Sequence, residues 1–377
     1  MSGTAAGSSW FQRFLLPGFA LKAVVIGGGY ATGRELAEYF LVSGPWGGLA
    51  AMLLATLLWS LIAAVTFSYA RLIDAYDYRA FFGALLGPAW IAFEAAYILF
   101  VILILAVFGA TAGAIGAAMF GAPEFVGTIL LAIGIIVTTA LGTTSVERVF
   151  KYVSFMLYGV YVLFLLLGLS TFGDRIAQGF ATPASADGWA IGGATYASYN
   201  IVGAVVILPV LRHLTSRRDA VVAGLIAGPL TMLPALLFFV CMIAFYPAIR
   251  LETLPSDFLL RQLDLPAFHW LFQFMIFLAL LESGAGSVHA INERIAGAVQ
   301  AKRGHALGIR ARALIGGALL IVCMVIANRI GLVALIANGY RLLAWLFLIV
   351  FVVPLLTIGL ARLLRRPPTP LSGEAAS

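Results

Sequence analysis

The chain is dominated by apolar segments that are each long enough to cross a lipid bilayer. A spanning helix needs roughly 20 apolar residues, and ten stretches of the 377-residue sequence approach or exceed that length. They lie at 14–41, 45–70, 88–119, 125–142, 148–171, 189–212, 220–246, 267–291, 311–328 and 332–361. Only 10% of the residues are charged, against about 25% in soluble domains. The sequence therefore predicts an all-α, polytopic membrane protein whose main partner is membrane lipid.

The distribution of Lys and Arg predicts how these segments are oriented. With the N-terminus in the cytoplasm, 16 of the 23 basic residues fall in inner loops, four in outer loops and three within segments. Because cytoplasmic loops are enriched in Lys and Arg, both termini are expected to be cytoplasmic. We expect the location to be the bacterial inner (plasma) membrane. The net charge of +7 is spread over short loops and indicates no nucleic-acid binding.

A polar segment at 173–188 divides the ten spans into two sets of five, at 12–172 and 189–362. Because five is odd, the second set must enter the membrane in the opposite sense to the first. The sequence thus predicts a single membrane domain over 1–377, built as a 5+5 inverted repeat. The tail at 367–377, PPTPLSGEAAS, is expected to be disordered.

Each predicted repeat begins with an apolar segment that is interrupted at mid-depth. The first contains IGGGYATG at 26–33, and the sixth reads GWAIGGATYASYNIVGAVVILP at 188–209. Glycine leaves a helix without steric cost, and unpaired backbone within a membrane is tolerated only where it lines a protein cavity. Matching interruptions in inverted halves indicate the midplane binding site of a secondary transporter. Taken alone, GGG has an alternative reading as a close-packing motif.

Half-helices that meet at such a site direct partial charges of both signs into it. A zwitterion such as an amino acid, or a related amine, suits that field. We therefore predict a secondary active transporter that moves a small organic solute by alternating access around 26–33 and 196–203. An ion or small-solute channel is the alternative. The sequence contains no recognisable catalytic motif or metal-ligand cluster, so we expect no enzyme activity, cofactor or metal site.

The motif GGGYATGRELAEYF at 27–40 closely resembles the first-helix signature of the YkvI-type bacterial membrane proteins, which are regarded as amino-acid permeases. The ten spans, with breaks in the first and sixth, also resemble the LeuT fold of the amino acid–polyamine–organocation superfamily. This resemblance extends over roughly residues 12–365. It implies ten transmembrane helices with discontinuous helices 1 and 6.

The resemblance also implies a substrate site at the two interruptions. It is formed by Gly27, Gly28, Gly29, Tyr30, Ala31, Tyr196, Tyr199, Asn200 and Gly203. Arg34 matches the position of an outer-gate arginine in LeuT-fold proteins, and Glu38 follows one turn later. Alternatively, Arg34 and Glu38 pair only to make their burial tolerable, and the two interpretations are compatible.

The eighth span carries a polar stripe that predicts ion or proton coupling. Charged residues within membrane spans are functional hypotheses by default, and helical spacing places Glu282, Gly286 and His289 on one face. Ser283 and Ser287 flank that face. Sodium-coupled LeuT-fold proteins have small and hydroxyl residues at a similar spacing, but Gly286 offers no hydroxyl.

Lys22 suggests coupling to protons instead of Na⁺. It lies about 12 Å into the first span at 1.5 Å per residue, where its ammonium reaches the space of a sodium ion. Desolvation favours neutral Lys and protonated Glu, so Lys22 and Glu282 are a candidate proton-coupling pair. A snorkelling Lys22 and an interfacial His289 are the alternatives, and uncoupled exchange stays open. The sequence does not determine the substrate, the oligomeric state or the roles of Glu94 and Arg341.

Overall fold

Helices occupy most of each range that the sequence predicted to span the membrane. The computed structural model describes residues 8–140, 143–303 and 308–365, and no strand occurs within them. The all-α prediction is therefore confirmed. In the first half, the long elements are α2 (Leu16–Val25), α3 (Gly28–Ala31), α4 (Arg34–Tyr39), α5 (Gly44–Leu72), α7 (Trp90–Phe120), α8 (Glu124–Ala140) and α9 (Thr143–Thr171).

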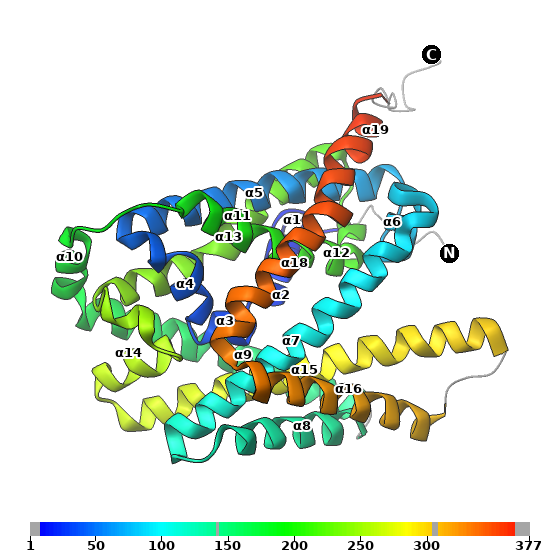
Figure 1. Cartoon of the computed structure of the whole chain (residues 1–377). Helices are drawn as coiled ribbons and strands as arrows, with labels where there is room; N and C mark the ends of the chain where they lie inside the picture. Colours follow the sequence, from blue (N-terminus) through cyan, green and yellow to red (C-terminus); the bar gives the residue numbers. More distant parts are fainter. Residues whose placement is uncertain (1–7, 141–142, 304–307, 366–377) are drawn as a thin grey trace.

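The second half repeats this order of elements. It contains α11 (Trp189–Asn200), α12 (Gly203–Val206), α13 (Arg217–Ile243), α15 (Pro266–Arg303), α16 (Ile309–Ile330), α17 (Leu332–Ala334), α18 (Tyr340–Phe347) and α19 (Leu360–Arg365). Short helices α1 (Trp10–Phe14), α6 (Tyr78–Leu86), α10 (Gly173–Ala181) and α14 (Pro255–Leu263) complete the chain. In Figure 1, α10 and α14 lie at one end of the long helices and α6 at the other. This placement agrees with the alternation of loops that the sequence predicted.

By length and composition, six helical stretches in the described ranges are able to cross a membrane. These are Arg34–Leu72, Tyr78–Phe120, Arg217–Ile243, Pro266–Gly297, Arg310–Ile330 and Leu332–Arg365. Met156–Thr171 and Gly173–Ala181, bent by 72°, add a seventh if they count as one span. The other predicted spans correspond to the shorter apolar helices α2 and α8 and to the interrupted α11–α12. The order of helices is consistent with ten spans, although helix length alone does not establish that count.

Both predicted interruptions are present. Ile26 and Gly27 lie outside any helix between α2 and α3. Gly33, with φ of 78°, then separates α3 from α4. A side chain at Gly33 is disfavoured because this left-handed conformation brings a Cβ against the backbone. In the sixth segment, the turn at 201–202 separates α11 from α12.

The long helices form two groups. In one group α5 packs against α13 and α11, and α13 packs against α2. In the other, α7 packs against α8 and α16, and α15 packs against α8 and α9. Helix α18 contacts both α11 and α7 and so connects the groups, as its central position in Figure 1 shows. Both interrupted segments therefore belong mainly to the first group and face the second.

Glycines determine how closely α5 and α13 approach. A Cβ at Gly224 would come closer than 3.0 Å to Ala64, and a Cβ at Gly228 would do so to Ser60. The Ser60 hydroxyl donates to the carbonyl oxygen of Leu225 at 2.9 Å. Without a hydrophobic force between helices in lipid, such close contacts and interhelical hydrogen bonds hold them together.

We expect Gly224→Ala to lower the melting temperature of the purified protein. Ala normally stabilises a helix by roughly 0.5–1 kcal/mol over Gly, but overpacking costs about 1–3 kcal/mol. The matched control is Gly159→Ala, because a Cβ at that helical position meets nothing within 4 Å. Equal melting temperatures for both variants in a detergent thermal-shift assay would contradict the packing argument.

Candidate functional site

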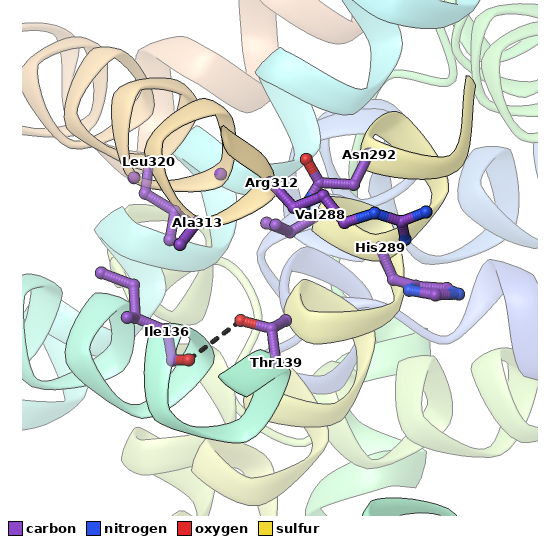
Figure 2. A pocket seen from close by; sticks show the side chains of 10 residues that line it. Ile136, Thr139, Val288, His289, Asn292, Arg312, Ala313 and Leu320 are labelled. Atoms are coloured by element: carbon purple, nitrogen blue, oxygen red, sulfur yellow. Dashed lines mark hydrogen bonds between the residues drawn. The ribbon is translucent and has the colours of Figure 1, made fainter. Parts of the chain in front are cut away.

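Helix α15 lies between two cavities, and the polar residues predicted along it are divided between them. His289 lines one cavity, of about 240 Å³, together with residues of α8 and α16 (Figure 2). Ser283, Gly286 and Ser287 line the other, of about 270 Å³. The expectation that Gly286 and His289 face the same side is therefore wrong. Positions three apart differ by about 60° around a helix, and here the boundary between the two cavities falls between Gly286 and His289.

The second cavity, which we call the central cavity, lies at both helix interruptions. Its wall comes from the two groups of helices: α2, the 26–27 break, α4, α7, α11, α12, α15 and α18. The side chains with polar atoms that line it are Glu35, Tyr97, Tyr199, Asn200, Ser283, Ser287 and Tyr340. Its volume lies just below the roughly 300–1,000 Å³ of typical ligand pockets, so a small solute fits it.

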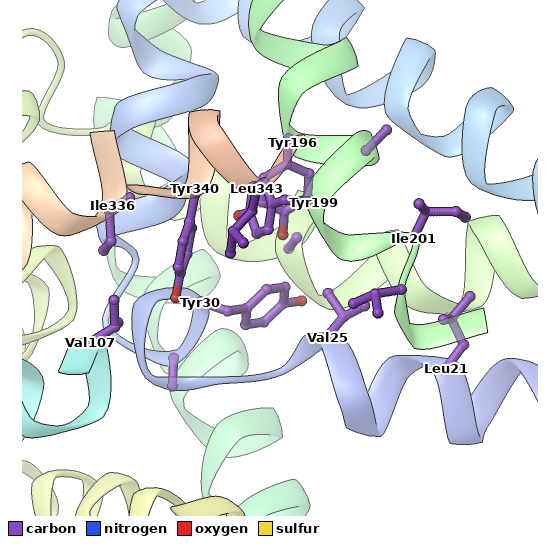
Figure 3. Close-up of a cluster of buried hydrophobic side chains, with 14 of the residues drawn as sticks. Leu21, Val25, Tyr30, Val107, Tyr196, Tyr199, Ile201, Ile336, Tyr340 and Leu343 are labelled. Atoms are coloured by element: carbon purple, nitrogen blue, oxygen red, sulfur yellow. The ribbon is translucent and has the colours of Figure 1, made fainter. Parts of the chain in front are cut away.

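The predicted substrate residues lie in or beside this cavity. Gly27, Tyr199 and Asn200 line it directly. Tyr30 and Tyr196 are 0% exposed, and Figure 3 shows their rings near the break in the first segment. Both hydroxyls lack a hydrogen-bond partner among the described residues.

The remaining predicted residues have different surroundings. Ala31 lines a smaller adjoining space that Gly27 and Ser283 also border. Gly29 lies against the side chain of Glu35, and Gly203 lies against Leu21. Gly203 is therefore a packing position between α12 and α2. Gly28 begins α3, and its surroundings lie outside the described residues.

Glu35 is the charged residue of this cavity that sequence reasoning missed, and the aromatic residues that α7 and α18 contribute to its wall were missed as well. It is 3% exposed, and its Oε2 accepts a hydrogen bond of 2.6 Å from the hydroxyl of Tyr199. The backbone N–H of Tyr30 also donates to its carboxylate. A signal was present in the sequence: adjacent helix residues point in different directions, so Arg34 and Glu35 need separate partners.

Arg34 points away from the cavity. Its Nη2 pairs with Glu38 Oε2 at 2.8 Å, which is the contact that the i, i+4 spacing predicted. Its Nη1 donates to the carbonyl oxygens of Arg250 and Glu252, each at 2.9 Å. These bonds tie α4 to the connection between α13 and α14.

Two of the predicted coupling residues, Lys22 and Glu282, lie near the same tyrosine and outside the wall of the central cavity. The Lys22 ammonium lies 4.2 Å from the ring centroid of Tyr158, and the Glu282 carboxylate interacts electrostatically with the same tyrosine. Ser283 and Ser287 are in the cavity wall, and the Ser287 hydroxyl donates to the carbonyl oxygen of Ser283 at 2.8 Å.

Glu94 has a partner that the sequence did not indicate. Arg294 Nη1 lies 2.7 Å from Glu94 Oε2. The guanidinium of Arg294 lies 3.9 Å from the ring centroid of Tyr78 and 4.0 Å from that of Tyr97. This cluster borders a further cavity of about 170 Å³, which shares Tyr97 and Val206 with the central cavity. Arg341 lies on the exposed side of α18.

The arrangement of helices is the LeuT fold, as comparison with solved structures shows. MhsT in complex with L-phenylalanine aligns with a TM-score of 0.57 and 16% identity, over 96% of this chain and 98% of that one. A Na⁺-coupled sialic acid symporter aligns at 0.59 and 13%, over 94% and 82%. A manganese transporter of Eremococcus coleocola aligns at 0.51 and 17%, over 90% and 77%. The predicted fold is therefore confirmed.

In sequence, the chain is similar to the uncharacterized membrane protein YkvI of Bacillus subtilis (strain 168). The two are 24% identical over 292 residues, which are 74% of this chain and 79% of YkvI. This similarity agrees with the YkvI-type resemblance of the first-helix motif. No family model matches the sequence.

We expect Arg34→Gln to open the side of the protein on which Arg34 lies. The change removes the ion pair to Glu38 and weakens the bonds to two loop carbonyl groups. The test is labelling of a Ser283→Cys reporter in intact cells by a membrane-impermeant thiol reagent, since both native cysteines are buried. We expect labelling to become several-fold faster. Arg329→Gln, an exposed change in α16, should have no effect. Unchanged labelling in Arg34→Gln would rule out a gating role.

Proposed function

We propose that the protein is a secondary active transporter that carries a small organic solute by alternating access. The observation that carries this proposal is the central cavity at both helix interruptions, between two groups of helices. In transporters with inverted repeats, one group moves against the other around a fixed midplane site. The substrate would contact the backbone at Gly27, with Tyr199 and Asn200 on the opposite wall.

An amino acid or a related amine is the substrate class that this proposal favours. MhsT binds L-phenylalanine and the sialic acid symporter binds sialic acid, so the fold accommodates small polar organic solutes. The channel alternative does not account for paired helix breaks that enclose one cavity. A channel conducts through a continuous pore and does not need an enclosed site, whereas a transporter binds and releases its substrate at such a site.

The geometry further supports a sidedness for the proposed cycle. The cavity wall includes 23–27, Val202, Val206 and four residues of α15 between Ser283 and Ala290, which lie towards the predicted cytoplasmic side of the breaks. Arg34 and Glu38 close the opposite side, so we propose them as the outer gate. Arg294 and Glu94 stand at the predicted cytoplasmic end. In line with the distribution of Lys and Arg, we propose that both termini lie in the cytoplasm and that the protein lies in the bacterial plasma membrane.

We also propose that transport is coupled to protons through Lys22 and Glu282. Both groups lie near Tyr158, so a change in the charge of one alters the electrostatic potential at the other. Sodium is the competing coupling ion, with Ser283 and Ser287 as candidate ligands. These two residues lie in the cavity wall, beside the first-segment break.

Counterflow in proteoliposomes tests the transport proposal. Liposomes preloaded with unlabelled phenylalanine or phenethylamine should accumulate the labelled compound transiently and saturably, which a channel cannot support. Gly27→Leu should abolish this uptake, because the added side chain enters the cavity that Gly27 lines. Gly297→Leu is the control, since a Cβ there meets no neighbouring atom. Intact counterflow in Gly27→Leu would show that the site is misassigned.

The pH dependence of uptake tests the coupling proposal. If Glu282 carries the proton, Glu282→Gln should flatten the pH profile and abolish stimulation by an imposed proton gradient. Asp187→Asn, an exposed change in a predicted outer loop, should keep the wild-type profile. An unchanged profile in Glu282→Gln, combined with dependence on Na⁺, would favour the serine site instead.

A further inference from the structure

Glu35 is the one charged side chain that lines the central cavity within the described part of the chain. The carboxyl group is almost fully buried, and an unpaired charge in such surroundings is costly. Breaking a buried charge pair has the same consequence, because it leaves one charge uncompensated. The carboxylate therefore requires a proton or a cation that enters the cavity from solution.

The basic side chains around the cavity are engaged with other groups. Arg34 pairs with Glu38 and with loop carbonyl oxygens. Lys22 lies over the ring of Tyr158. Arg294 pairs with Glu94 between two tyrosine rings. None of the three is part of the cavity wall.

Aromatic rings form much of the remaining wall. Tyr97, Phe100, Phe108, Tyr199 and Tyr340 all line the central cavity. The rings of Tyr199 and Tyr340 lie 4.5 Å apart between centroids, and Figure 3 shows both beside the interruption. Aromatic faces attract organic ammonium groups through the ring quadrupole. Together with a carboxylate, they form surroundings that suit an organic cation.

A substrate carboxylate would compete with Glu35 for the hydrogen-bond donors at the break. Glu35 itself takes the backbone N–H of Tyr30 and packs against Gly29 in the interrupted segment. The hydroxyl of Tyr199 already donates to Glu35, and that of Ser287 to a backbone carbonyl. A second carboxylate would also be repelled by Glu35. The protein's own acid thus occupies the position that the anionic end of a zwitterion needs.

We propose that the central cavity binds an organic monocation, an amine with a small apolar body and no carboxylate, whose ammonium group pairs with Glu35. The inference rests on the proposed function, since it assigns the substrate class of that same transport site. Glu35 supplies the counter-charge, and the aromatic rings of α7, α11 and α18 enclose the apolar body.

Three probes that share a phenyl ring on a two-carbon chain and differ in their charged groups test this proposal on the purified full-length protein. They are phenethylamine, phenylalanine and 3-phenylpropionate, and binding is measured by thermal shift and isothermal titration. We expect phenethylamine to bind at least about tenfold more tightly than the other two, which corresponds to about 1.4 kcal/mol. Tighter binding of phenylalanine or of 3-phenylpropionate would overturn the inference, as would absence of binding by phenethylamine at millimolar concentration.

Variants then locate the counter-charge. Glu35→Gln should weaken phenethylamine binding roughly thirtyfold to several-thousandfold, because removal of one partner of a buried charge pair costs about 2–5 kcal/mol. Glu35→Asp keeps the charge and should retain part of the affinity. Glu124→Gln removes an exposed carboxylate and should change nothing. Wild-type affinity in a folded Glu35→Gln variant would overturn the assignment of Glu35 as the counter-charge. If this variant does not fold, the relative affinities of the wild-type protein for the three probes decide the question.

Counterflow separates this inference from the proposed function. If phenethylamine binds in a Glu35-dependent way but shows no counterflow, the cation site is supported and the transport proposal is contradicted. If counterflow of phenylalanine persists in Glu35→Gln, the transport proposal is supported and the cation site is contradicted.

Discussion

Hydrocarbon offers no hydrogen-bond partner to an open peptide group, and the break at 26–27 would be unstable in contact with lipid. The rest of the structure encloses that break. The group that contains α5, α11 and α13 carries both interruptions, and the group that contains α7 and α15 covers them. Because helix ends cannot fill the space between two such groups completely, the enclosure leaves a cavity. The central cavity is thus a direct consequence of burying interrupted backbone inside a membrane.

Arg34 and Glu35 show how one helix turn serves two purposes. The guanidinium points to the connection between α13 and α14, where it contacts two carbonyl oxygens, and it also pairs with Glu38 of its own helix. The carboxylate of the next residue points into the central cavity among tyrosines. Small residues elsewhere, such as Gly224 against Ala64, let the helices close tightly enough to keep lipid out. Charge is therefore confined to a few positions, each with a defined direction.

The sequence predicted what depends on local pattern. Apolar length located the helices, the GGG at 27–29 located the break, and i, i+4 spacing located the Arg34–Glu38 pair. Features that depend on which helices pack together could not be predicted from the sequence. Glu94 and Arg294 are 200 positions apart in the chain, and His289 faces α16 because of tertiary packing, which periodicity does not reveal. Glu35 was overlooked for a related reason, since its partner Tyr199 lies in the other half. The limits of the two repeats stay a prediction.

The hydrogen bonds that Arg34 makes to backbone carbonyl oxygens have a consequence for movement. An arginine that is held by a carboxylate can pass to another charged side chain as the helices move. The backbone carbonyl oxygens of this loop offer no such alternative partner. When α4 separates from this loop, the guanidinium and both oxygens must be hydrated at once. The contact can therefore break only as bulk water enters the space between α4 and this loop, so the opened state is hydrated as soon as it forms.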